Sequence, residues 1–410
     1  MINLHCPSYI CKFADLTKDL VSDLVGCSYY LSLKMLFEFF LGEYESVSEL
    51  IRLNAWTLSE SQFLNLILRF DGNRFLKRMR ESILRRYKGK LNFEDFVLAI
   101  DDTDNPKYSK YLFGVQSWRC SKGSYYGQKI LVIALVDVKN KFAIPLDFRV
   151  CWPKKDQGKD DKKSGIDLAF ELIVNASKDF GFLPVVADSW FDSSDLAVKL
   201  RNSGITYVWE IKSNRKAKKG PGRHKSWKSL SCLFLGMERQ QVNSEKNKWI
   251  SERLIVLKSK STQIKSVAAF NRKNGKDAFA YYASTDRCMP GAKVWKIFRD
   301  RWNIECLFHD LKSHLNFGRL SVSDDKANEL AFVIPFFIIT YCRLNPGAFG
   351  LKQNMTVKGM IKTLKTEQEF LTLDLVKNRK FHKLLEKIKI RKNNINKKPV
   401  ISGTEGYRAA

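Results

Sequence analysis

The sequence is poor in the residues that interrupt helices and strands. It has only 10 prolines and 22 glycines among 410 residues, whereas 44% of its residues are hydrophobic and 12% are aromatic. Such a chain can bury substantial apolar surface, which excludes a wholly disordered protein. Because a single hydrophobic core stops growing at roughly 250–300 residues, we expect two or more domains.

Cysteine pairs with the spacing of a zinc site are also missing. The nine cysteines are odd in number and scattered, without a CxxC pair, which is typical of reduced intracellular thiols. The N-terminus lacks a basic region followed by an apolar signal core, and the longest apolar run, Leu330 to Cys342, has 13 residues and contains Pro335. Since this run is too short for a bilayer core of about 30 Å, we expect a soluble, cytoplasmic protein without a membrane partner.

Acidic residues are few relative to basic ones. The chain has 71 Lys and Arg against 43 Asp and Glu, a formal net charge of +28. A field of this sign concentrates polyanions, so nucleic acid is the predicted partner and the protein is expected at the nucleoid. The alternative is a solvated lysine surface without a ligand.

Both ends of the chain are basic and helical in pattern. From about Asp15 to Tyr87 apolar residues recur at three- and four-residue steps, and basic residues gather between Arg74 and Lys90. This predicts a helical DNA-binding domain over residues 1–92, the alternative being a helical cap on a larger core. Residues 346–410 form a second basic region, with ten basic residues against one acidic residue between Lys377 and Lys398.

The middle of the chain predicts a mixed α/β fold. Three strands, a helix, a strand, a helix and a strand follow one another in the pattern. Their ranges are Phe96–Ile100, Ile130–Val138, Phe142–Val150, Ile166–Ser177, Leu183–Ala187, Ser193–Asn202 and Ile205–Ile211. We therefore expect residues 93–212 to form the first part of an α/β core, and residues 289–345 to form its second part.

Residues 213–288 are expected to form a β-rich insertion between these two parts. The charged, glycine-containing stretch from Lys212 to Lys228 predicts a loop at its start. Strands are expected around Cys232–Leu235, Arg253–Leu257, Ser266–Phe270 and Ala278–Ala283.

Acidic residues follow two of the core strands. Asp101, Asp102 and Asp104 come after Phe96–Ile100, and Asp188 comes after Leu183–Ala187. Carboxylates at strand ends lie at the rim of an α/β sheet, where ligands bind. A single such aspartate would be explained by turn or N-cap chemistry, whereas two sets at separate core strands favour a site.

A third acidic residue lies in a predicted helix that starts near Ala292 and continues past Leu315. Phe298, Arg301, Glu305 and Lys312 fall on one face of this helix at about 100° per residue. An exposed salt-bridged stripe is the simpler interpretation. The apolar density around the stripe instead predicts a largely buried helix, whose charges need partners.

These residues carry a resemblance to a known family. Phe298, Arg301, Glu305 and Lys312 match the Y-x2-R-x3-E-x6-K signature of bacterial insertion-sequence DDE transposases, with phenylalanine in the place of tyrosine. IDDTDNPK at 100–107 resembles their first aspartate motif, and VVADSWF at 185–191 resembles the second. The group with this signature carries a β-rich insertion before the catalytic glutamate, and the 117 residues between Asp188 and Glu305 leave room for one.

The resemblance implies a ribonuclease-H-like core whose Asp101, Asp188 and Glu305 bind Mg²⁺ or Mn²⁺, with two ions expected. Carboxylate oxygens suit such hard cations. The apolar strand before the first motif does not distinguish Asp101 from Asp102 by alternation. We prefer Asp101, which leaves Thr103 two places on, as in family members with D-S-T.

By the same resemblance, Arg301 and Lys312 would hold terminal DNA phosphates, and Phe298 lacks the hydroxyl that the family aims at one. Trp227 and Trp249 are candidates to stack on a flipped base, the alternative being core tryptophans.

The function implied is cut-and-paste DNA transposition. The enzyme would cleave double-stranded DNA at the terminal inverted repeats of its element and join the ends to target DNA, acting as a homodimer in the DNA complex. A ribonuclease-H-like nuclease without strand transfer, or an inactive DNA-binding relic of a transposase, are the alternatives.

Overall fold

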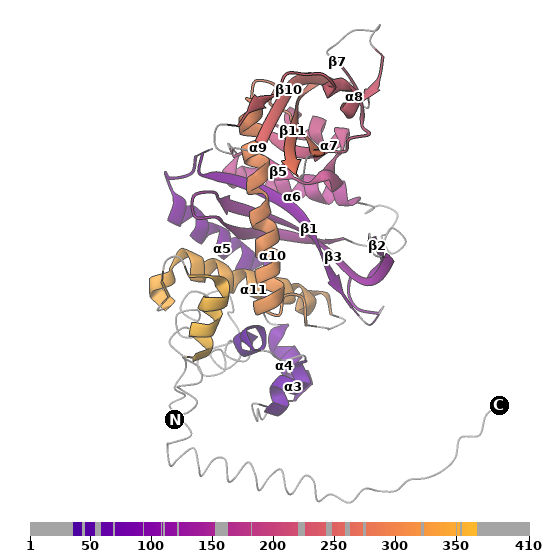
Figure 1. Cartoon of the computed structure of the whole chain (residues 1–410). Helices are drawn as coiled ribbons and strands as arrows, with labels where there is room; N and C mark the ends of the chain where they lie inside the picture. The colour runs from indigo at the N-terminus through magenta and orange to yellow at the C-terminus, as the bar shows by residue number, and fades with distance from the viewer. Residues whose placement is uncertain are drawn as a thin grey trace, which may run out of the picture.

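The computed structural model of the chain describes most residues between 36 and 366 (Figure 1). The ranges left out within this span are 43–45, 54–58, 69, 93, 108, 110, 121–122, 152–162, 182, 220–225, 243–247, 259–262, 274–275, 321–323, 350 and 353–354. The basic segment from Lys377 to Lys398 lies outside the described residues.

The described residues between 36 and 87 are mainly helical, in agreement with the predicted periodicity, whereas the predicted helical residues before 36 lie outside the described part of the chain. A helix at 36–41 is followed by α3 (Val47–Leu53), α4 (Glu60–Ile67) and α5 (Gly72–Tyr87). Asp71 caps α5 by accepting hydrogen bonds from the backbone of Asn73 and Arg74. The apolar face of α5 packs on a later helix, with Phe75 edge-on to Phe337 at 5.2 Å between ring centroids. The basic residues of α5 lie mainly on its outer side.

The central sheet begins with four antiparallel strands and continues with two strands parallel to the first of them. Its strands are β1 (Phe96–Pro106), β2 (Gln116–Cys120), β3 (Gly123–Asp137), β4 (Phe142–Cys151), β5 (Val185–Ala187) and β6 (Tyr207–Ile211). Helix α6 (Gly165–Phe180) connects β4 to β5, and η1 (Ser189–Phe191) and α7 (Ser194–Asn202) connect β5 to β6. The spatial order β4-β3-β1-β5-β6, with β1 antiparallel to β3 and parallel to β5, is that of a ribonuclease-H-like core. The predicted mixed α/β fold class is confirmed.

Residues beyond β6 extend the same sheet. Strands β12 (Lys276–Ser284), β11 (Gln263–Lys273), β10 (Lys248–Leu257), β7 (Lys216–Lys219) and β8 (Lys228–Ser229) add on in that order, and β9 (Gln240–Gln241) pairs with β10. Figure 1 shows these strands at the top of the molecule.

Two local predictions in this region are wrong. The strand expected at Cys232–Leu235 lies mostly in helix α8 (Leu230–Phe234). Its apolar residues Leu230, Leu233 and Phe234 have helical spacing and are buried on one side. The predicted loop at 212–228 contains β7, because Ala217 to Lys219 pair with the last residues of β10.

Three long helices follow the sheet, and the 3-10 helix η3 (Pro346–Phe349) and a helix at 357–366 come after them. Helices α9 (Gly291–Asp300) and α10 (Trp302–His314) cross one face of the sheet, while α6 lies behind the other (Figure 1). The single helix predicted from Ala292 to beyond Leu315 is therefore divided at Arg301, which keeps helical φ and ψ of −53° and −33°, so the two halves run end to end.

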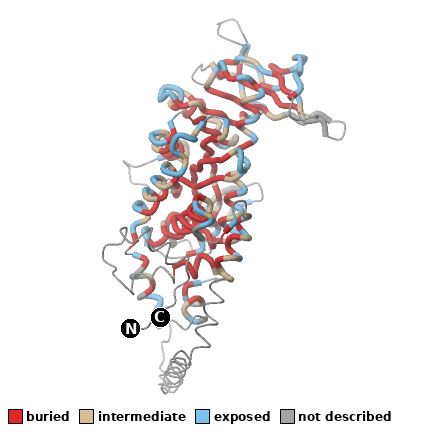
Figure 2. Tube along the Cα trace, turned by 90° about the vertical axis from the view of Figure 1, so that its left-hand side faces the viewer, coloured by how far each residue is buried: buried red, intermediate tan, exposed pale blue. Residues whose placement is uncertain are grey.

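Helix α11 (Asp325–Leu344) passes through the centre of the buried region (Figure 2). It is the one helix among the described residues that is long and apolar enough to cross a bilayer, and 89% of that stretch is buried inside the fold. A core helix meets the same criteria, so this observation is weak support for a membrane span.

Candidate active site

The aspartates of the first motif lie inside a strand rather than after it. Strand β1 runs to Pro106 because its antiparallel pairing with β3 continues as far as Gly127. Successive residues of a strand point to opposite faces, so Asp101 faces the side covered by α10 and Asp102 faces the other. Backbone pairing thus separates two carboxylates that are adjacent in sequence.

Asp101 is buried against the junction of α9 and α10. Only 7% of the residue is exposed, and its Oδ2 lies 2.6 Å from Nη1 of Arg301. The same guanidinium donates from Nη2 to Oε1 of Glu305 at 2.5 Å. Burial raises the pKa of Asp101 to about 7, against the lowering effect of Arg301. Strand β1 and helix α10, which are 200 residues apart in sequence, are therefore joined by one cation between two carboxylates.

Asp188 is on the same face of the sheet. The pairing of Ala99 with Val186 aligns β1 and β5, and Asp188 continues β5 in an extended conformation. Its side chain accepts a hydrogen bond of 2.8 Å from the backbone of Trp190, so it also caps η1. The negative charge of Asp188 contributes to the raised pKa of Asp101. Asp188 thus caps η1 and also lies near Asp101. The N-cap interpretation and the functional-site interpretation of this residue therefore both hold.

Asp102 lies in a different environment. Its Oδ2 accepts a 2.6 Å hydrogen bond from Nζ of Lys129, and both side chains are about 15% exposed. Nζ of Lys129 is also 5.5 Å and 5.4 Å from the ring centroids of Trp118 and Trp190. Asp102 therefore has a cation partner on the α6 side of the sheet, and the same Nζ lies 3.9 Å from Oδ1 of Asp104.

Lys312 and Phe298, the other two residues of the predicted helix face, have different contacts. Nζ of Lys312 donates to the backbone carbonyl of Asp104 at 2.6 Å, and burial lowers the pKa of this lysine. The ring of Phe298 packs on Tyr282 with 4.4 Å between centroids and lies 5.4 Å from the Arg301 guanidinium carbon. Lys312 thus approaches the same strand as Arg301 does, at Asp104, three residues after Asp101.

The two tryptophans of the insertion are not brought to the acidic residues. Trp249 lies on β10, and three strands separate β10 from β5 in the sheet. Trp227 precedes β8 at the far end of the sheet, where Nζ of Lys218 lies 4.9 Å from its ring centroid.

Sequence reasoning missed Glu210. This residue lies on β6, and the pairing of Ala187 with Trp209 places it beside Asp188. Burial raises the pKa of Glu210, Asp188 raises it further, and Arg301 lowers it. The signal was present in the sequence, because Glu210 is the one charged residue in the otherwise uncharged run Ile205–Ile211.

The donor types of Asp101, Asp188 and Glu305 fit a divalent cation, but their present arrangement is not a ready metal site. In the described part of the chain no group of three His, Cys, Asp or Glu side chains is placed to hold a metal ion. Arg301 accounts for this, because its guanidinium bridges Asp101 and Glu305. Hard carboxylate oxygens could bind Mg²⁺ or Mn²⁺ once Arg301 moves aside.

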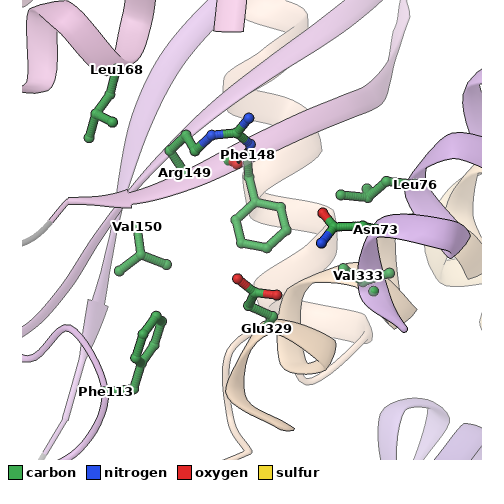
Figure 3. Close-up of a pocket in the computed structure, with 10 residues that line it drawn as sticks. Asn73, Leu76, Phe113, Phe148, Arg149, Val150, Leu168, Glu329 and Val333 are labelled. Atoms are coloured by element: carbon green, nitrogen blue, oxygen red, sulfur yellow. Dashed lines mark hydrogen bonds between the residues drawn. The ribbon is translucent and has the colours of Figure 1, made fainter. Parts of the chain in front are cut away.

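A cavity of about 250 Å³ lies elsewhere, between α5, β4 and α11 (Figure 3). Its walls are mainly apolar, and the Glu329 carboxylate points into it near Phe148. None of the acidic residues on the α10 face lines it.

A mixed sheet in this order, with carboxylates from β1, β5 and an adjoining helix gathered on one face, defines the ribonuclease-H-like class of nucleic-acid-processing enzymes. A family model described as "Transposase DDE domain" matches residues 92–341. Since that is more than half of the chain, the protein belongs to this family, whose substrate is DNA.

Other comparisons add little. No curated protein matches the sequence. A solved structure, the NurA nuclease from Sulfolobus solfataricus, is similar with a TM-score of 0.26 and 12% identity, over 56% of this chain and 81% of that one. This likeness is too slight to carry an argument.

Proposed function

We propose that this protein is a cut-and-paste transposase that cleaves DNA at the ends of an insertion sequence and joins them to target DNA. The observation that carries the proposal is the gathering of Asp101, Asp188 and Glu305 on one sheet face around Arg301. Three acidic residues from three separate elements share this face with one bridging cation, Arg301, although like charges repel.

In this proposal Asp101, Asp188 and Glu305 hold two Mg²⁺ or Mn²⁺ ions. Bound ions of this kind activate an attacking hydroxyl and stabilise a leaving oxygen. Asp101 must lose its proton to act as a ligand. Asp102 remains a second candidate for the first acid, but it faces the α6 side with Lys129, whereas Asp101 shares Arg301 with Glu305.

The basic residues have the complementary role of binding phosphate. Arg301 and Lys312 lie on either side of Glu305 along α10, so both can reach a DNA strand laid across that acid. The exposed Arg74, Lys77, Arg85 and Arg86 of α5 would supply further phosphate contacts, in keeping with a DNA-binding part at residues 1–92. Residues 93–212 and 289–345 form the proposed core, 213–288 the insertion and 346–410 a basic C-terminal region. A homodimer on the two element ends completes the proposal.

The test is Mg²⁺-dependent nicking of DNA that carries the inverted repeats flanking the reading frame. Asp188→Asn and Glu305→Gln keep side-chain size and are expected to abolish nicking while preserving DNA binding. Glu171→Gln, an exposed acid on α6, is the matched control. Nicking by both active-site variants at the wild-type rate would overturn the assignment, and nicking without joining would favour a nuclease.

A further inference from the structure

Glu210 lies in a row of residues that share the face of the catalytic acids. Strand pairing aligns Ala99 with Val186 and Ala187 with Trp209. Because alternation repeats every two residues, Asp101, Asp188 and Glu210 point to the same side of three neighbouring strands. Tyr282 on β12 pairs with Glu210 and continues the row to the ring of Phe298.

The side chain of Glu210 is half buried and makes no hydrogen bond or ion pair within the described residues. A second unsatisfied group lies close by. Nε of Arg301 is buried and lacks a hydrogen-bond partner in the same part of the chain. Arg301 donates from Nη1 to Asp101 and from Nη2 to Glu305. Its Nε donor and the half-buried carboxylate of Glu210 therefore remain without hydrogen bonds on the same face.

A metal ion and Arg301 compete for the same two carboxylates. Cation binding by Asp101 and Glu305 requires the guanidinium to leave them. A buried guanidinium without a counter-charge is costly, so its displacement needs another acceptor. Asp188 is itself committed to the metal in the proposed function, which leaves Glu210 as the acid on this face that is free to receive the charge.

We propose that Glu210 is a positioning residue that accepts Arg301 when Asp101 and Glu305 bind a divalent cation. The inference rests on the proposed function, because it assumes that these acids bind metal. Arg301 then stays beside the site, held by Glu210, with its outer N–H groups directed to the position of a DNA phosphate. Glu210 thereby lowers the free-energy cost of replacing the guanidinium by the metal.

The test is a double-mutant cycle on Mn²⁺ binding by the full-length protein, measured by calorimetry without DNA. Glu210→Gln is expected to weaken Mn²⁺ binding about tenfold, within the range for residues that support metal ligands. The melting temperature of Glu210→Gln without metal should stay at the wild-type value, since Nη1 and Nη2 of Arg301 then donate to Asp101 and Glu305. In an Arg301→Gln background the same change should weaken binding less than about threefold, because the cation to be received is absent. Glu210→Asp should restore part of the affinity.

The outcomes separate this inference from the proposed function. An equal loss of affinity in both backgrounds would mean that Glu210 acts on the metal directly, which overturns a role through Arg301. Wild-type affinity in Glu210→Gln would also overturn it. If Arg301→Gln fails to fold, Arg301→Met serves as the second background, because it also removes the cation that Glu210 is proposed to receive. Absence of Mn²⁺ binding by the wild type would overturn the proposed function instead.

Discussion

Two faces of strand β1 hold neighbouring aspartates in contrasting surroundings. On the α6 face, Asp102 pairs with Lys129, a cation from the adjacent strand that has Trp118 and Trp190 nearby. On the α10 face, Asp101 shares Arg301 with Glu305 and lies near Asp188, so acids outnumber cations. The first arrangement pairs Lys129 closely with Asp102, and the more exposed Asp104 lies 3.9 Å from the same Nζ. The second keeps excess negative charge in a buried place, which stability alone does not favour.

The largest expected effect is on activity. Asp101→Asn should reduce Mg²⁺-dependent nicking below detection, because it removes a proposed metal ligand, whereas Asp102→Asn should retain measurable nicking. Both variants need the fold verified by circular dichroism. Equal loss in the two variants would remove the functional contrast between the faces.

The second effect is on the free energy of unfolding, which should depend more on the ion pair of the α6 face than on the acids of the α10 face. Lys129→Met leaves Asp102 buried without its partner, which is expected to lower the free energy of unfolding by about 3 kcal/mol. The double variant Lys129→Met, Asp102→Asn should regain much of this loss, since no buried charge remains. Urea unfolding of the single and double variants without metal measures both. If Lys129→Met alone unfolds like the wild type, the pair is not a structural anchor.

The smallest effect is a pH dependence of the α10 face. Burial raises the folded-state pKa of Asp101 from 3.8 to about 7. The metal-free fold therefore gains stability from this group below its unfolded pKa and loses that gain as pH rises through about 7. Metal binding must expel the proton, so Mn²⁺ affinity should rise up to about tenfold per pH unit below pH 7 and level off above it.

Calorimetry in two buffers of different ionisation enthalpy would measure the released proton directly. The matched control is Glu171→Gln on α6, which should keep the same slope because Glu171 pairs with Lys163 and does not contribute to the shift of Asp101. A constant Mn²⁺ affinity between about pH 5.5 and 7 would contradict the shift.

Much of the core could be predicted from local pattern. Apolar runs such as Leu183–Ala187, and the helical spacing in Ile166–Ser177, correspond to β5 and α6 because burial on one or both faces imposes those patterns. Local pattern was misleading at Cys232–Leu235, where a short apolar run is compatible with either a strand or a helix. Local pattern also placed the end of β1 too early, at Ile100 instead of Pro106. The polar residues of β1 stay paired because the neighbouring strand β3 continues beside them.

The sequence by itself determined the fold class, the order of the acidic motifs and the excess of positive charge, because these depend on composition and on short-range periodicity. Only the tertiary structure decided that Asp101 faces Arg301 while Asp102 faces Lys129, and that Glu210 joins the row beside Asp188. Those outcomes follow from the register of β1 with β3 and β5 and from the position of α10 on the sheet. Register and packing are set by contacts between residues up to 200 positions apart, which alternation within a single strand does not encode.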